Sequence, residues 1–212
     1  MSILSTQRSA RAIVAFCAVI AIALRPGSLS AQILSAQVDE PRAFIGITIG
    51  PAIPFGSFAD KANRPEAGRA KLGYNDTFVN FGKRIGSHFG IAGSFFYNEH
   101  YMEDAAEDDW WQVAGLTAGP MYSMPVAPRT ILDLKLKFGL LTTKPIVDQY
   151  EVTKGSGFVT DARVGVRYNV HRRWCLLAES GVVVSNQSME DGGKQGVRIL
   201  VTGVGVAYRP SW

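Results

Sequence analysis

Charged side chains recur at alternate positions in two segments near the middle of this chain. In residues 131–141 the charged positions share one face of a strand and leucines share the other, and residues 158–170 repeat the pattern with valines. Successive side chains of a strand point to opposite sides, so these cations and carboxylates face one another across neighbouring strands, where they can form ion pairs. We expect one charge network of Asp76, Arg84, Asp133, Lys135, Lys137, Asp161, Arg163, Arg167 and Glu179.

The three histidines are the candidates for a catalytic base. Nucleophilic catalysis needs a nucleophile such as serine, a base and a group that orients the base. His88 and His171 lie at expected tight turns, and His100 begins an expected loop beside Glu99. Because no serine accompanies them in a catalytic pattern, we interpret His100 as a solvated loop residue and predict no catalytic residues.

A run of acids in residues 99–109 raises the question of a metal site. Carboxylate oxygens are ligands that Ca²⁺ and Mg²⁺ accept, but the spacing here does not match an EF-hand loop. Such a run is usually a solvated loop. The chain also lacks a phosphate-cradling glycine motif, a zinc spacing and a dinucleotide fingerprint. We therefore predict neither a metal nor a cofactor.

The N-terminal segment has the order of a secretory signal peptide. Arg8 and Arg11 precede an uninterrupted apolar run at 12–24, and small residues follow it. The run is shorter than the roughly 20 residues of a membrane-spanning helix. We place the signal peptide at 1–31 and a short lead at 32–42. Cleavage after Ser30 or Ala36, or a retained helical anchor, are the alternatives.

Removal of residues 1–31 changes the charge of the chain. The whole sequence has 22 Lys and Arg against 18 Asp and Glu, and residues 1–31 contain three arginines and no acid, which leaves 19 − 18 = +1. This balance gives no reason to expect nucleic-acid binding. Cys17 leaves with the signal peptide, so Cys175 has no partner for an intrachain disulfide.

The elements that position the charges are strands. Alternation of apolar with polar or small residues indicates eight of them, at 43–53, 77–85, 89–97, 110–124, 131–141, 158–170, 174–184 and 197–208. Long connections at 57–71, 98–109, 142–156 and 185–196 alternate with short ones at 86–87, 125–129 and 169–173. This arrangement is typical of an all-β, antiparallel, up-and-down barrel.

Two features decide which face of the barrel points outward. The polar face combines both charge signs with many glycines, which suits the narrow lumen of an eight-stranded barrel better than a soluble surface. The apolar face has aromatic residues near strand ends, as in the girdles of transmembrane barrels: Phe44, Phe89, Tyr97, Phe158, Tyr168, Trp174 and Tyr208. We expect a transmembrane β-barrel at 43–212, and a soluble lipocalin-like barrel is the alternative. The expected lipid-facing residues are Leu132, Leu134, Leu136, Phe138, Leu140, Val164, Val166, Val204, Val206 and Tyr208.

The first and last strands resemble those of a known family. Gly46-Ile47-Thr48-Ile49-Gly50, Pro54-Phe55-Gly56, the segment from Gly203 to Arg209 and a terminal Trp212 in register with Tyr208 are similar to small outer-membrane barrels. These form the OmpX/OmpA-like superfamily, which includes barrel proteins common in Bacteroidetes-type bacteria. The resemblance covers 43–212.

The resemblance implies a location and partners. It implies an integral protein of the Gram-negative outer membrane, in contact with membrane lipids and lipopolysaccharide, with Tyr208 and Trp212 as a signal to the barrel assembly machinery. We expect a monomer with a non-enzymatic structural or surface-interaction role and a lumen plugged by charged side chains. A lipid A-modifying enzyme, either a deacylase or an acyltransferase, and an accessory barrel of a secretion system are the alternatives.

Overall fold

The computed structural model describes residues 42–60, 69–103, 109–147, 150–151 and 153–210, and within them eight long strands close into a barrel. The barrel strands are β1 (Ala43–Pro54), β2 (Arg69–Arg84), β3 (Phe89–Glu103), β4 (Trp110–Ala127), β5 (Thr130–Val147), β7 (Gly155–His171), β8 (Trp174–Met189) and β9 (Lys194–Tyr208). A short strand β6 (Tyr150–Glu151) pairs with the end of β5, and one 3-10 turn, η2 (Gly56–Phe58), follows β1. The predicted all-β, eight-stranded, antiparallel barrel is confirmed.

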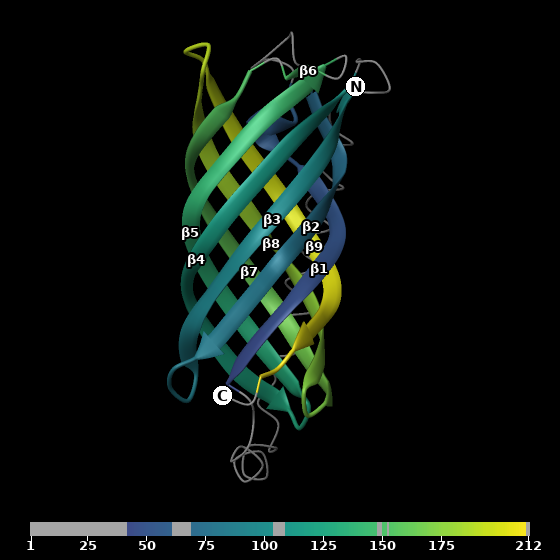
Figure 1. Cartoon of the computed structure of the whole chain (residues 1–212), viewed down its shortest axis with the longest axis vertical. Coiled ribbons are helices and arrows are strands. Elements are labelled where there is room, and N and C mark those ends of the chain that lie inside the picture. The colour runs from purple at the N-terminus through teal and green to yellow at the C-terminus, as the bar shows by residue number, and fades with distance from the viewer. Residues whose placement is uncertain (1–41, 61–68, 104–108, 148–149, 152, 211–212) are drawn as a thin grey trace, which may run out of the picture.

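Closure of the sheet joins the first strand to the last. Each barrel strand pairs antiparallel with its neighbours in the chain, and β9 returns to β1 with Ile45 opposite Tyr208 and Pro54 opposite Ile199. The strands cross the barrel at a tilt (Figure 1). A closed sheet has no unpaired edge, which is the condition for a β-structure in hydrocarbon. No helix among the described residues is long and apolar enough to cross a membrane.

The two ends of the barrel differ. The hairpins β2–β3, β4–β5 and β7–β8 turn within a few residues at the end where β1 begins and β9 finishes. At this tight-turn end, the backbone amides of Ile85 and Gly86 both donate to the carbonyl of Phe89. The opposite, long-loop end includes η2, β6 and the β8–β9 hairpin, which rises at the upper left of Figure 1.

Most strands continue further toward the long-loop end than the sequence pattern indicates. The structure begins β2 at Arg69, eight residues before the expected start at 77, and it extends β3 to Glu103, β5 to Val147 and β8 to Met189. The strands remain paired there, with Ala70 opposite Met102 and Trp111 opposite Pro145. An outer face in contact with water needs no apolar residues, so alternation disappears from the sequence before the strand ends. Several predicted loops are therefore shorter than expected.

The pairing of β5 with β7 separates the two faces of the wall. Lys135 lies directly opposite Arg163, and Leu134 lies opposite Val164. The two cations are buried in the lumen, whereas Leu134 is about half exposed on the outer surface. Charged residues thus face inward and aliphatic residues outward, at the same height on the same strands.

The seam between β1 and β9 depends on the absence of side chains. A Cβ atom added to Gly205 would lie 1.8 Å from the carbonyl oxygen of Ile47, and one added to Gly46 would lie 2.3 Å from the carbonyl oxygen of Val206. Backbone on the neighbouring strand leaves no room for a methyl group at either position. These glycines allow the first and last strands to approach closely enough to pair.

Gly205→Val should therefore weaken closure of the barrel. The valine must displace the backbone of β1, and overpacking of this kind costs at least about 1–3 kcal/mol. The measurement is urea unfolding in lipid vesicles, together with the gel shift between boiled and unboiled samples. Gly86→Val is the control, because no atom lies within 4 Å of a Cβ at that turn. Equal stability of the two variants would contradict the role assigned to the seam.

Candidate functional site

A network of buried ion pairs crosses the middle of the lumen. Lys135 on β5 pairs with Glu179 on β8, and its Nζ also donates to Oδ1 of Asn80 on β2 at 3.1 Å. The Asn80 side-chain amide in turn donates to Oε2 of Glu179 at 2.7 Å. The three side chains form a closed ring of contacts that connects opposite walls of the barrel.

A second group of charges lies against the first. Lys137 and Asp161 are direct neighbours across β5 and β7, with Nζ and Oδ2 2.7 Å apart. Nε of Arg163 donates to Oδ1 of the same aspartate at 2.8 Å, and its Nη1 is 3.8 Å from Oε2 of Glu179. Because Arg163 contacts both carboxylates, it links this group to the Lys135 ring.

Hydroxyl groups on β2, β3 and β4 add to the central network. Nη1 of Arg163 donates to Thr77 on β2 at 3.3 Å. Ser94 on β3 accepts from Lys137 and lies 3.0 Å from Thr117 on β4. These neutral groups supply hydrogen bonds to Arg163 and Lys137 beyond those of the ion pairs, and such bonds offset part of the cost of burying a charge.

A third pair lies nearer the tight-turn end. Asp133 accepts two hydrogen bonds from the guanidinium of Arg167, and Ser123 donates to its Oδ1 at 2.6 Å. The ring of Phe44 lies beneath the guanidinium carbon of Arg167 at 4.5 Å, and Nζ of Lys135 is 5.0 Å from the same ring. The aromatic face stabilises both cations away from water.

The position of Phe44 corrects one expectation. We expected it in an outer aromatic girdle, but it is fully buried in the lumen, on the same face as Gly46 and Thr48. It lies opposite Gly82, where an added Cβ would be 2.3 Å from the phenyl ring. The space left by Gly82 is filled by Phe44.

The structure divides the predicted network residues into two groups. Those that are buried on the inner face are Arg84, Asp133, Lys135, Lys137, Asp161, Arg163, Arg167 and Glu179. Asp76 is instead partly exposed on the outer face, between Ile49 and Tyr97. The reason is a bulge between Thr77 and Val79, which inserts one residue and reverses the alternation of β2. The prediction for Asp76 is therefore wrong.

The predicted lipid-facing residues lie on the outer surface. Leu140 is 71% exposed and Val204 is 64% exposed, and the remaining members are partly or largely exposed: Leu132, Leu134, Leu136, Phe138, Val164, Val166, Val206 and Tyr208. Tyr208 packs edge to face with Trp174, with ring centroids 5.4 Å apart, at the tight-turn end. Trp212, the other half of the expected assembly signal, lies outside the described residues.

Sequence reasoning missed an apolar layer inside the long-loop half of the barrel. Buried side chains from several strands gather there, among them Phe96, Trp111, Leu141 and Ile199. Phe58 of η2 enters this layer and contacts the ring of Trp111 edge to face at 5.5 Å. The signal in the sequence was the segment 110–124, where both faces are partly apolar because the inner face packs in this layer.

His100 lies in this layer and not in a solvated loop, so that expectation is wrong. Its side chain is fully buried, next to Phe58, with ring centroids 5.3 Å apart. Nδ1 is 3.0 Å from the carbonyl oxygen of Lys71 and donates to it, and Nε2 has no partner among the described residues. No described serine or carboxylate is in hydrogen-bond contact with Nε2.

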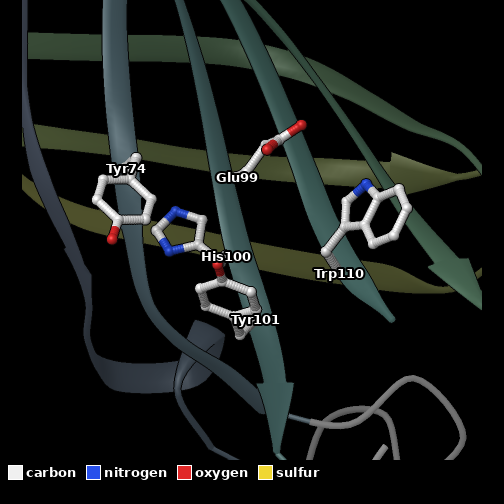
Figure 2. Close-up of a pocket in the computed structure, with 5 residues that line it drawn as sticks. All are labelled: Tyr74, Glu99, His100, Tyr101 and Trp110. Carbon is white, nitrogen blue, oxygen red and sulfur yellow. The ribbon is translucent and has the colours of Figure 1, made fainter. Parts of the chain in front are cut away.

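Two hollows open on the outer surface near the long-loop end. The first, of about 140 Å³, is lined by Tyr74, Glu99, His100, Tyr101 and Trp110, which Figure 2 shows on neighbouring strands. The second, of about 180 Å³, lies on the adjacent strands and its lining includes Tyr97, Gln112, Thr142, Lys144, Glu151 and Lys154. We call them the aromatic hollow and the lysine hollow.

The charged lumen leads to a test with paired variants. Arg163→Val should remove a partner of Asp161 and of Glu179, and breaking a buried ion pair costs about 3–5 kcal/mol. The double variant Arg163→Val, Asp161→Asn should recover part of this loss, because the uncompensated buried charge is what destabilises. Urea unfolding of both variants in vesicles measures the difference. A single variant as stable as the unmodified barrel would show that Arg163 does not belong to a buried network.

Comparison with known proteins identifies the fold. No family model and no curated protein sequence matches the chain. Among solved structures, Neisserial surface protein A matches with a TM-score of 0.58 and 14% identity over 79% of this chain and 97% of that one. The Ail protein of Yersinia pestis matches with 0.46 and 17% over 79% and 98%, and OprG of Pseudomonas aeruginosa with 0.46 and 13% over 80% and 96%. At 14% identity, the likeness to Neisserial surface protein A establishes the fold alone. The chain is an integral β-barrel with the fold of small outer-membrane proteins.

Proposed function

We propose that this protein is a non-enzymatic surface barrel of the Gram-negative outer membrane, similar to the OmpX/OmpA-like superfamily. The observation that supports this most directly is the reversal of polarity across the wall. Lys135 on β5 and Arg163 on β7 are buried inside, while Leu134 and Leu136 on β5 are exposed outside. A water-soluble barrel would have the opposite arrangement, whereas lipid requires this one.

The lumen is proposed to be closed. An eight-stranded barrel is just wide enough for side chains to fill it. The ion pairs of Lys135 and Lys137 cross its middle, and the apolar layer with Phe58 occupies the half above them. Such an interior supports a role in the membrane or at its surface better than a role as a channel.

The orientation follows from the two ends. Outer-membrane barrels place short turns in the periplasm and longer loops outside the cell. The long-loop end, with the extended β8–β9 hairpin, is then presented at the cell surface. We propose contact with outer-membrane lipids and lipopolysaccharide along the wall, assembly by the barrel assembly machinery, and a monomeric state.

The position of the histidine does not favour a lipid A enzyme. An enzyme of this kind needs a nucleophile and an orienting group in contact with its base. The Nε2 of His100 is buried, the ring lies beside Phe58, and no described serine or carboxylate contacts this nitrogen. The surface role is therefore the function that the geometry supports best.

A charge on the outer wall should block insertion. Val164→Arg places a cation among the lipid-facing residues, and near the midplane this costs about 2–4 kcal/mol. Ser188→Arg is the matched control, because Ser188 is also exposed but lies close to the β8–β9 turn. The fraction folded into vesicles is measured by gel shift. Equal folding of Val164→Arg and the control would mean that this face does not contact lipid.

The surface role has its own experiment in cells. The protein should fractionate with the outer membrane and require detergent for extraction, and an epitope inserted at Asp191 should bind antibody on intact cells. Mass spectra of lipid A should be identical with and without the protein. An epitope that is reached only after the cells are opened would refute the orientation, and an altered acylation pattern would show an enzyme.

A further inference from the structure

The aromatic and lysine hollows lie where the outer wall changes from apolar to polar. Leu116 on β4 and Leu140 on β5 lie opposite each other and are 65% and 71% exposed. Two residues further toward the long-loop end, Ala114 lies opposite Thr142, and after two more Gln112 lies opposite Lys144. This boundary corresponds to the level at which acyl chains meet lipid headgroups.

The two hollows lie next to each other on the outer wall, and we refer to them together as the groove. Glu99 of the aromatic hollow lies directly opposite Gln112 of the lysine hollow across β3 and β4. The hydroxyl of Tyr97, which lines the lysine hollow, donates to Oε1 of Glu99 at 2.8 Å. A single ligand that follows the wall would therefore contact both.

The side chains of the groove combine three kinds of chemistry. Tyr74 and Tyr101 are 60% and 57% exposed, so their ring faces are accessible for stacking. Carboxylate, amide and hydroxyl groups supply hydrogen-bond donors and acceptors, and Lys144 and Lys154 supply positive charge. The indole Nε1–H of Trp110 is buried and has no acceptor among the described residues. Aromatic faces beside mixed polar groups suit a sugar ring, and ammonium groups suit a phosphate.

We propose that this groove binds the phosphorylated sugar headgroup of an outer-leaflet glycolipid whose acyl chains lie along the leucines below. The sugar lies in the aromatic hollow, and a phosphate lies between Lys144 and Lys154. The inference rests on the proposed orientation of the barrel in the outer membrane. A soluble glycan is disfavoured because the groove joins the apolar belt directly, so acyl chains are required to fill the adjoining surface.

Glu151 allows a prediction in which loss of a side-chain charge strengthens binding. Its Oε2 is 3.1 Å from Nζ of Lys144, and the two side chains are 42% and 39% exposed. An exposed pair of this kind is weak, so a phosphate can displace the carboxylate. Removal of the carboxylate charge should therefore strengthen binding, whereas removal of either lysine should weaken it.

The experiment uses the folded full-length barrel in detergent. Rough-type lipopolysaccharide is titrated and its retention is followed by native mass spectrometry, with phosphatase-treated lipopolysaccharide, phosphatidylglycerol and the deacylated oligosaccharide as separate probes. The variants are Lys144→Gln with Lys154→Gln, Trp110→Leu, and Glu151→Gln. Lys194→Gln is the control, because it removes an exposed lysine from the β8–β9 hairpin, which does not line the groove. Gel shift verifies that each variant is folded.

The proposal predicts that the double lysine variant and Trp110→Leu bind rough lipopolysaccharide about tenfold more weakly, as expected for lost charge-assisted contacts. Glu151→Gln should bind more tightly, and the control should be unchanged. If all variants retained rough lipopolysaccharide equally, or if the barrel retained phosphatidylglycerol as well as rough lipopolysaccharide, the groove would make only unspecific lipid contacts and the proposal would be overturned. Equal binding of the phosphatase-treated form would overturn the phosphate position, and equal binding of the deacylated oligosaccharide would overturn the glycolipid. Each of these results would leave the surface barrel itself intact, because fractionation and epitope exposure test it separately.

Discussion

Closure of the sheet is the constraint on which the rest of this structure depends. In hydrocarbon every backbone amide and carbonyl must find a partner within the protein, and a closed antiparallel sheet meets this requirement. The closing seam joins Ile45 to Tyr208, residues that are separated by most of the described chain. Glycines on both strands allow the backbones to approach, which links a local feature of the sequence to the global closure.

Closure with eight strands also determines the character of the interior. The lumen is narrow, so the inner side chains contact one another and must match in charge and size. Near the middle, cations from β5 and β7 meet carboxylates from β7 and β8. Toward the long loops the matching is achieved with apolar side chains around Phe96 and Trp111 instead. The interior therefore consists of a charged layer near the middle and an apolar layer toward the long loops. The outer wall changes in the opposite sense, from apolar near the middle to polar toward the long loops, so the residue types of the two faces are set separately.

The function proposed for the barrel follows from this separation of the inner face from the outer face. Inner contacts stabilise the closed form, while the outer wall and the long-loop end remain available to lipid and to surface partners. The groove beside Tyr97 and Lys144 is a consequence of strands that continue beyond the apolar belt. If the strands ended at the belt, these side chains would belong to separate loops and would have no fixed positions relative to one another.

The sequence by itself determined the number of barrel strands, their direction and the face that each residue takes along most of them. It did so because a strand in a membrane wall repeats every two residues, and both faces impose strong demands on residue type. Lys135, Arg163, Leu134 and Val164 could each be assigned to a side on this basis alone.

Only the tertiary structure decided where that repeat is broken and which residues meet. A bulge in β2 moves Asp76 to the outer face, because one inserted residue reverses alternation without changing composition. His100 lies inside a strand that continues past the apolar belt, where the outer face no longer needs apolar residues and the pattern fades. The partners of Lys135, namely Asn80 and Glu179, come from strands far apart in the sequence, and only the closed barrel brings them into contact. Alternation specifies a side of the wall, whereas contact across the lumen depends on how the closed strands are staggered.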